Sequence, residues 1–169
     1  MTTFPLRAPS PAPAPERAVV IRPATLADVP AMAAVMEPFV RTGDLLPRST
    51  DDLSRHIGEY VLAETGAGTI VGTGSLKIYS PALAEIAALA VRDDSQGQGV
   101  GRELVAQLIA NARALGLAQV FGLTRRAPFF QRLGFRMAAR EEFPLKVWGD
   151  CARCPRQHAC DEVAVALQL

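Results

Sequence analysis

Hydrophobic and polar residues follow two different periods along this chain. Apolar and β-branched runs bounded by Gly or Pro predict strands, and apolar residues spaced by three or four predict helices. The predicted strands cover residues 18–23, 61–64, 69–80, 84–91, 117–124, 135–140 and 162–169. One predicted helix follows Thr25–Asp28, and others cover residues 51–60, 99–115 and 127–134. This order predicts an α/β (α+β) fold with helices on both faces of one sheet.

Composition places the chain among globular proteins. Of its 169 residues, 49% are hydrophobic and 21% are charged, which excludes a disordered protein. The net charge of +1 gives no indication of a nucleic-acid or anionic-membrane partner. Residues 1–17 are rich in Pro and Ala and are predicted to be a disordered tail, so the domain covers 18–169. With no apolar run long enough to span a bilayer and no signal-peptide core, we expect a cytoplasmic protein.

The stretch QGQGVG (96–101) places three glycines between a buried strand and a helix. Free backbone N–H groups and the positive end of the helix dipole make such a junction a natural phosphate site. An isolated Gly-x-Gly also fits a flexible surface turn. The spacing matches neither a P-loop nor a dinucleotide fingerprint, because no Lys follows and the glycines are evenly spaced.

This stretch fits the pattern Gln-x-x-Gly-x-Gly, which resembles the acetyl-CoA signature of the GNAT superfamily of N-acetyltransferases. The preceding strand end "LAV", the helix "RELVAQLIANARALG" and the later "FFQRLGFR" lie at the spacing of that family. The resemblance covers residues 18–169. It implies the GNAT fold, with a mixed and mostly antiparallel sheet, and acetyl-CoA as co-substrate.

The resemblance also implies which residues contact the cofactor. Backbone amides of the glycine stretch would bind the pyrophosphate, the strand end would pair with the pantetheine arm, and two aromatic rings would line its other side. Phe129 fits a core position equally well. The implied residues are Gln96, Gly97, Gln98, Gly99, Val100, Gly101 and Arg102 for the pyrophosphate, Leu89, Ala90 and Val91 for the arm, and Phe129 and Phe130 for the aromatic side.

Acetyl transfer to an amine requires a base, an oxyanion donor and a route for protonating the thiolate. Glu85 is the one acid of an otherwise apolar strand and is the candidate base, although a solvated edge carboxylate is the alternative. A backbone N–H near 89–91 would meet the oxyanion. Many GNAT enzymes carry a Tyr acid in the short helix, where this chain has Phe129 and Phe130. Thr124 is therefore a weak candidate acid, and Tyr79 a weaker one.

A narrower resemblance bears on the acceptor amine. The segments LLPRS (45–49), LTRRAPFFQRLGF (123–135) and EFPLKVWGDCARCPRQHACDEVAV (142–165) are similar to the short, stand-alone N-acetylglutamate synthases. This implies acetylation of the α-amine of L-glutamate, the first step of arginine biosynthesis. A dicarboxylate requires cations. Arg48 and Lys146 are the favoured ones, with Arg125 and Arg41 nearby, and each is also consistent with a solvated surface charge.

Other interpretations stay open at this stage. The acceptor could be another small amine or a protein N-terminus, and the chain could be a non-catalytic CoA-binding sensor. Cys151, Cys154, His158 and Cys160 could hold zinc, although their spacing is tighter than in usual knuckles, and reduced thiols without a metal are the favoured interpretation. The sequence does not indicate whether the protein forms a homodimer.

Overall fold

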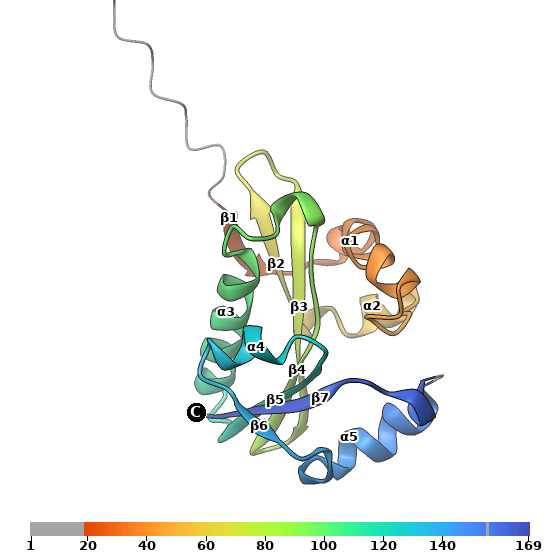
Figure 1. Ribbon diagram of the computed structural model, residues 1–169. Helices are drawn as coiled ribbons and strands as arrows, with labels where there is room; N and C mark the ends of the chain where they lie inside the picture. Colours follow the sequence, from red (N-terminus) through yellow and green to blue (C-terminus); the bar gives the residue numbers. More distant parts are fainter. Residues whose placement is uncertain (1–18, 155) are drawn as a thin grey trace, which may run out of the picture.

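Seven strands form one sheet in the computed structural model, which describes residues 19–154 and 156–169 (Figure 1). The tail predicted at 1–17 lies outside the described residues. The strands are β1 Val19–Pro23, β2 Tyr60–Thr65, β3 Ile70–Ser80, β4 Leu83–Val91, β5 Gln119–Thr124, β6 Arg136–Ala138 and β7 Val163–Gln168. The helices are α1 Val29–Arg41, α2 Thr50–Arg55, α3 Val100–Ala114, α4 Ala127–Gln131 and α5 Pro144–Gly149, with short 3-10 turns between several elements.

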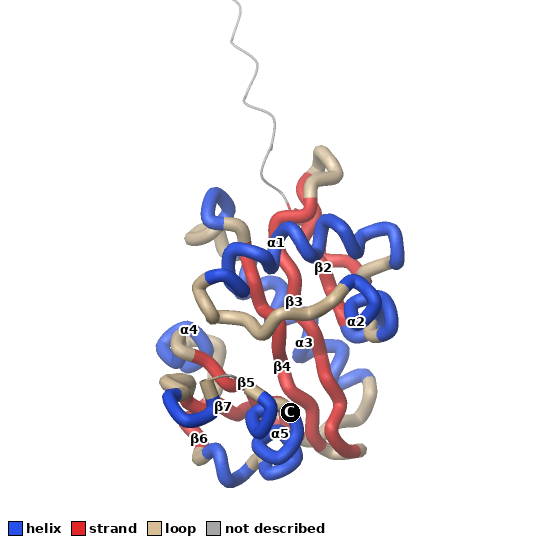
Figure 2. The backbone as a smooth tube through the Cα atoms, turned by 90° about the vertical axis from the view of Figure 1, so that its right-hand side faces the viewer, coloured by secondary structure: helices blue, strands red, loops and turns tan. Residues whose placement is uncertain are grey.

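The strand order is β1-β2-β3-β4-β5-β7-β6. Only the β4–β5 pair is parallel among the described strands, and the other neighbouring pairs are antiparallel, so the predicted mixed and mostly antiparallel sheet is confirmed. The parallel register runs from Leu83–Gln119 to Glu85–Phe121. Beyond Glu85 the two strands separate, as Figure 2 shows. This separation leaves a gap in the middle of the sheet.

Helices cover both faces of the sheet, as the sequence predicted. Figure 1 shows α3 on one face and α1 and α2 on the other. Leu104, Val105 and Leu108 of α3 are fully buried against the sheet, and Met32 of α1 is fully buried on the opposite face. Each such side chain contributes about 1.5–3 kcal/mol by leaving water. None of the helices in the described ranges is long and apolar enough to cross a membrane.

Two features differ from the sequence prediction. The second helix ends at Arg55, and Tyr60 already belongs to β2, where its ring is buried. Helix α5 was not predicted, because six residues are too few to show a helical period. Its position is fixed by packing, since Phe143 at its start stacks on Phe121 of β5 with ring centroids 4.1 Å apart. This contact fixes the start of α5 against β5.

Candidate functional site

A cavity of about 510 Å³ lies at the gap between β4 and β5. It brings together most residues that the sequence singled out for cofactor, catalysis and acceptor. These are Arg48, Glu85, Leu89, Val91, Gln96, Gly97, Gly99, Val100, Gly101, Arg102, Thr124, Arg125, Phe129, Phe130 and Lys146. Two expected cofactor side chains point elsewhere. Ala90 packs in the core beneath α1, and the Gln98 amide donates to the Asp94 carbonyl at 2.9 Å.

The glycine stretch forms a tight loop at the start of α3. Gly97 and Gly99 have φ of +74° and +88°, values that side-chain-bearing residues rarely adopt, and Gly99 is the N-cap of α3. The Gln96 amide donates to the Val91 carbonyl and to Asp93, each at 2.9 Å. These bonds fix the loop to the end of β4. The free N–H groups of the first turn of α3 consequently lie at the cavity edge, where an anion is favoured.

We expect Gly99→Ala to lower the free energy of unfolding by about 1–2 kcal/mol, because a Cβ is strained in the left-handed region. Urea unfolding of the two proteins measures this difference. Gly66→Ala is the matched control, since Gly66 lies in a turn without a positive φ and an added Cβ there would meet no atom within 4 Å. Equal losses in the two variants would contradict the backbone argument.

Phe129 and Phe130 have different roles. A Cβ added at Gly101 would lie 3.5 Å from the Phe129 ring, so α4 approaches the start of α3 closely at the cavity. Phe129 is partly exposed there, whereas Phe130 is 5% exposed and packs edge-on against Phe135 in the core. Phe129 packs against the core and also lines the cavity, so its contact with the cofactor stays a prediction.

Three arginines line the cavity, one from α3 and two from the ends of α4. Arg102, Arg126 and Arg132 line it, and none of them forms an ion pair with any residue in the described ranges. Cations without a carboxylate partner beside a helix N-terminus favour a phosphorylated ligand.

Strand β4 is irregular where it borders the gap. Ala88 has φ of +49°, and the register with β3 shifts so that Ala88 and Leu89 lie opposite the single residue Gly74. This arrangement is a β-bulge, which re-aims backbone groups and is frequent beside active sites. The bulge lies on the cavity wall, two residues beyond Ile86.

Glu85 lies at the point where β4 and β5 separate. Its side chain is 4% exposed, so it is not the solvated edge carboxylate that the sequence left open. Lys146 Nζ lies 3.0 Å from Glu85 Oε1, and the Tyr79 hydroxyl donates to Glu85 Oε2 at 3.0 Å. Both oxygens therefore have a partner from a different element, Lys146 from α5 and Tyr79 from β3.

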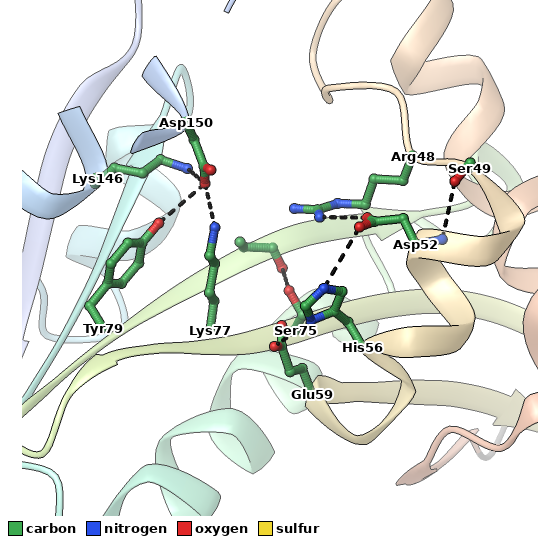
Figure 3. A network of polar contacts seen from close by, with 11 residues as sticks. Arg48, Ser49, Asp52, His56, Glu59, Ser75, Lys77, Tyr79, Lys146 and Asp150 are labelled. Atoms are coloured by element: carbon green, nitrogen blue, oxygen red, sulfur yellow. Dashed lines mark hydrogen bonds and ion pairs between the residues drawn. The ribbon is translucent and has the colours of Figure 1, made fainter. Parts of the chain in front are cut away.

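Asp150 follows α5 and contacts Lys77, Tyr79 and Lys146, as Figure 3 shows. Its Oδ2 atom lies 2.7 Å from Lys77 Nζ, 3.1 Å from Lys146 Nζ and 3.2 Å from the Tyr79 hydroxyl, whose single proton is shared between Asp150 and Glu85. Burial opposes its ionisation, but the Lys77 hydrogen bond and the Lys146 charge outweigh burial and hold the pKa of Asp150 far below its usual value. Burial, together with Glu85 and Asp150, raises the pKa of Tyr79.

We expect Asp150→Asn to flatten the acid side of the stability profile. Because the folded pKa of Asp150 is depressed, its contribution is present above the ordinary value of 3.8 and is lost as pH falls below it. Urea unfolding between pH 6 and about 2.5 measures the slope. Asp51→Asn is the control, since Asp51 is exposed and forms no ion pair in the described part of the chain. Identical acid slopes in wild type and Asp150→Asn would contradict this account.

The predicted acceptor cations have unequal surroundings. Arg48 is 25% exposed, and its Nη1 atom bonds Asp52 at 3.2 Å, which leaves most of its N–H donors available (Figure 3). Arg125 instead bonds Asp161, Asp44 and the Gly43 carbonyl. Its guanidinium thus joins two loops while it lines the cavity, and its binding of substrate stays a prediction.

Two further residues that the sequence singled out have different positions. Arg41 is 71% exposed and pairs with Glu37 at the end of α1, so it lies outside the cavity. Thr124 ends β5 on the cavity wall, and its Oγ1 accepts from the Arg126 N–H at 2.9 Å. Within the described residues, the Thr124 hydroxyl donates its proton to no other group.

Sequence reasoning missed several polar groups of the cavity. Lys77 and Asp150 complete the network around Glu85. Arg140, Arg156 and Glu162 line the part of the cavity that we call the acceptor end. Burial raises the pKa of Glu162. The acidic residue directly before the strand run at 163–168 was a usable signal for Glu162, but nothing local marks the other four.

The three cysteines are free and half-buried, and all line the acceptor end of the cavity. His158 is exposed on the surface. Among the described residues, no group of three or more His, Cys, Asp or Glu side chains is placed to hold a metal ion.

Comparison with known proteins identifies the family. The model of the acetyltransferase (GNAT) family matches residues 30–135. This chain belongs to the GNAT acetyltransferase family. The family resemblance inferred from the glutamine–glycine motif is therefore confirmed.

Among GNAT relatives, an uncharacterized N-acetyltransferase of Chlorobaculum tepidum is 36% identical, over 88% of this chain and 96% of that protein. The amino-acid acetyltransferase of Neisseria meningitidis is 38% identical, over 78% of this chain but 30% of that protein. The chain thus spans about 30% of the length of that longer relative.

Solved GNAT structures show the same arrangement. N-acetylglutamate synthase from Neisseria gonorrhoeae, complexed with coenzyme A and N-acetyl-glutamate, superposes with a TM-score of 0.79 at 31% identity, over 89% of this chain and 35% of that chain. Rv2747 from Mycobacterium tuberculosis, in complex with CoA, superposes with a TM-score of 0.76 at 28% identity, over 89% of this chain and 99% of that chain. The predicted fold and the narrower resemblance to N-acetylglutamate synthases are both confirmed.

Proposed function

We propose that this GNAT protein transfers the acetyl group of acetyl-CoA to the α-amine of L-glutamate. The observation that carries the proposal is Glu85, a buried acid placed between an anion-binding loop and a wall of cations within one cavity. The Neisseria gonorrhoeae synthase, whose structure holds coenzyme A and N-acetyl-glutamate, supports this choice. The product would enter arginine biosynthesis, and we place the protein in the cytoplasm.

The cofactor would occupy the loop and the gap. Its pyrophosphate would accept from the first-turn amides of α3, with Arg102, Arg126 and Arg132 available to its phosphates. Its pantetheine arm would lie along β4 beyond Glu85, where β5 no longer occupies the hydrogen-bonding edge. The thioester would then reach the bulge at Ala88 and Leu89, whose backbone N–H would stabilise the oxyanion.

The transfer step needs a neutral amine. Glu85 would take a proton from the acceptor ammonium, directly or through water. Its partners Tyr79 and Lys146, and Asp150 beside them, would share the positive charge that this proton brings. The amine nitrogen then forms a bond to the thioester carbon, and the carbon–sulfur bond breaks. The second proton, which the nitrogen sheds as the amide forms, passes to the leaving thiolate through water or through the Thr124 hydroxyl, which takes up one proton as it gives another, in place of the missing Tyr.

Recognition of glutamate requires two cationic positions for its two carboxylates. Arg48 supplies one from the loop before α2, with a planar fork suited to a carboxylate. Arg140 and Arg156 also line the cavity and are the candidates for the second, and Arg156 pairs with Asp161 at 3.7 Å and donates to the Gly43 carbonyl at 3.4 Å. Lys146 spends two of its three N–H donors on Glu85 and Asp150, so we assign it to orienting Glu85 and leave one donor for substrate.

Release of CoA from acetyl-CoA, followed with a thiol reagent across the twenty amino acids, tests the proposal. We expect glutamate to give the highest kcat/KM, with aspartate about 10- to 100-fold lower because one methylene changes the span between the cations. A polyamine and a peptide with a free N-terminus are included. Faster turnover with either of these would favour another acceptor, and no amine-dependent release at all would favour a CoA-binding sensor.

A further inference from the structure

Cys151 and Cys154 are the two ends of a single tight turn. Residues Cys151–Arg153 form a 3-10 turn, and the Cys154 N–H donates to the Cys151 carbonyl at 3.1 Å. A turn closed in this way holds its first and fourth Cα atoms within about 7 Å. Disulfides join Cα atoms about 4.4–6.8 Å apart, and both thiols are free. The backbone is therefore already shaped for a bond between them.

Each of these sulfurs has a hydrogen-bond donor. Arg140 Nη2 donates to Cys151 Sγ at 3.7 Å, and the Arg156 N–H donates to Cys154 Sγ at 3.4 Å. Burial opposes the charge of Arg140, but the sulfurs of Cys151 and Cys160 outweigh it and raise the pKa of that guanidinium. All these groups line the acceptor end of the cavity, so a small reagent that enters the cavity reaches the thiols.

We propose that Cys151 and Cys154 are a dithiol site, oxidised to an intramolecular disulfide by low-molecular-weight disulfides such as glutathione disulfide. One cysteine sulfur attacks a sulfur of the oxidant, the oxidant's S–S bond breaks, and one glutathione leaves with a proton. The second cysteine then displaces the other glutathione, which also leaves as a thiol. Two cysteine thiols are oxidised and one glutathione disulfide is reduced to two thiols.

The disulfide changes the acceptor end of the cavity and leaves the glycine loop unchanged. Cys151 Sγ must turn toward Cys154 and give up its bond from Arg140, which is one of the cations offered to the substrate. Cys151 also directly follows Asp150, whose carboxylate positions Lys146 beside Glu85. The loop at 96–102 makes no bond to this turn in the described structure. Oxidation should therefore weaken acceptor binding and leave CoA binding unchanged.

Mass spectrometry of the full chain after glutathione disulfide or dithiothreitol tests the bond directly. Trypsin cleaves after Arg153, so the peptides that carry Cys151 and Cys154 separate unless a disulfide joins them. We expect joined peptides in wild type and in Cys160→Ser, and separate peptides in Cys154→Ser. A disulfide between Cys151 and Cys160 would overturn the proposal. Cysteines that stay joined to glutathione and form no disulfide within the protein would also overturn it.

Kinetics test the consequence. The KM for glutamate should rise about tenfold on oxidation of wild type and of Cys160→Ser, and the oxidised-to-reduced ratio should be one in Cys154→Ser. Using the ratio within each variant removes any effect of the substitution itself. The change in KM rests on the proposed function, whereas the disulfide does not. If the reduced enzyme acetylates no amine, the proposed function is overturned and the peptide masses alone decide the dithiol site. If the disulfide forms and the KM for glutamate is unchanged, the proposed effect of the disulfide on acceptor binding is overturned.

Discussion

We expect Glu85→Gln to lower kcat for acetyl transfer by about 10²- to 10⁴-fold, the range for loss of a general base. The amide keeps the shape of the side chain but cannot take the proton of the acceptor ammonium. Because Glu85 is far from the glycine loop along β4, the Kd for CoA should stay within about twofold. Steady-state kinetics and calorimetric titration with CoA measure the two quantities.

The buried position of Glu85 calls for a separate check of folding. Lys146 keeps its bond to Asp150 in the variant, so no ammonium is left without a carboxylate. Unchanged CoA affinity shows that the variant folds, and Glu37→Gln on the exposed surface of α1 is the matched control. A folded Glu85→Gln enzyme with wild-type kcat at every pH would refute the base assignment.

Arg48→Gln raises the KM for glutamate by about 10- to 100-fold, which corresponds to about 1.5–3 kcal/mol for charge-assisted bonds to a carboxylate. The kcat should change less, because under the proposed function Arg48 binds a carboxylate remote from the reacting amine. Arg48→Lys should recover part of the loss, since it restores the charge without the planar fork. Kinetics with glutamate varied at saturating acetyl-CoA measure these effects.

Arg41→Gln is the control for this pair of variants. Arg41 lies only seven residues away in the sequence but is exposed at the end of α1. The loss of the Arg48 bond to Asp52 is a surface effect of less than about 1 kcal/mol on stability. Equal KM values for the Arg41 and Arg48 variants would place the substrate carboxylates elsewhere in the cavity.

Local sequence signals and the family resemblance together were sufficient for the fold and for the position of the glycine loop. The glycine loop, the end of β4 and the start of α3 are contiguous, so their arrangement follows from one short stretch of chain. Glu85 was recognisable because it is the one acid within an apolar strand. These features depend on neighbours within a few residues.

The acceptor end could not be predicted as well, because its partners are distant in sequence. Asp150 bonds Lys77 across 73 residues, and Arg125 bonds Asp44 across 81. The sequence shows that Arg125 is charged but not that its charge is already matched. Helix α5, which carries Lys146, depends on the stacking of Phe143 on Phe121 and has no periodic pattern of its own.

The short register between β4 and β5 has a mechanical consequence. A backbone register of three residue pairs, together with a shared core and the bonds Lys77–Asp150 and Arg125–Asp44, joins a body of β1–β4 with α1–α3 to a second body of β5–β7 with α4 and α5. Arg48 belongs to the first body, while Lys146 and Arg140 belong to the second. Under the proposed function, a pantetheine arm in the gap would brace the two bodies against each other. Acetyl-CoA would then fix the distance between the two groups of cations that bind the amino acid, as well as supplying the acetyl group.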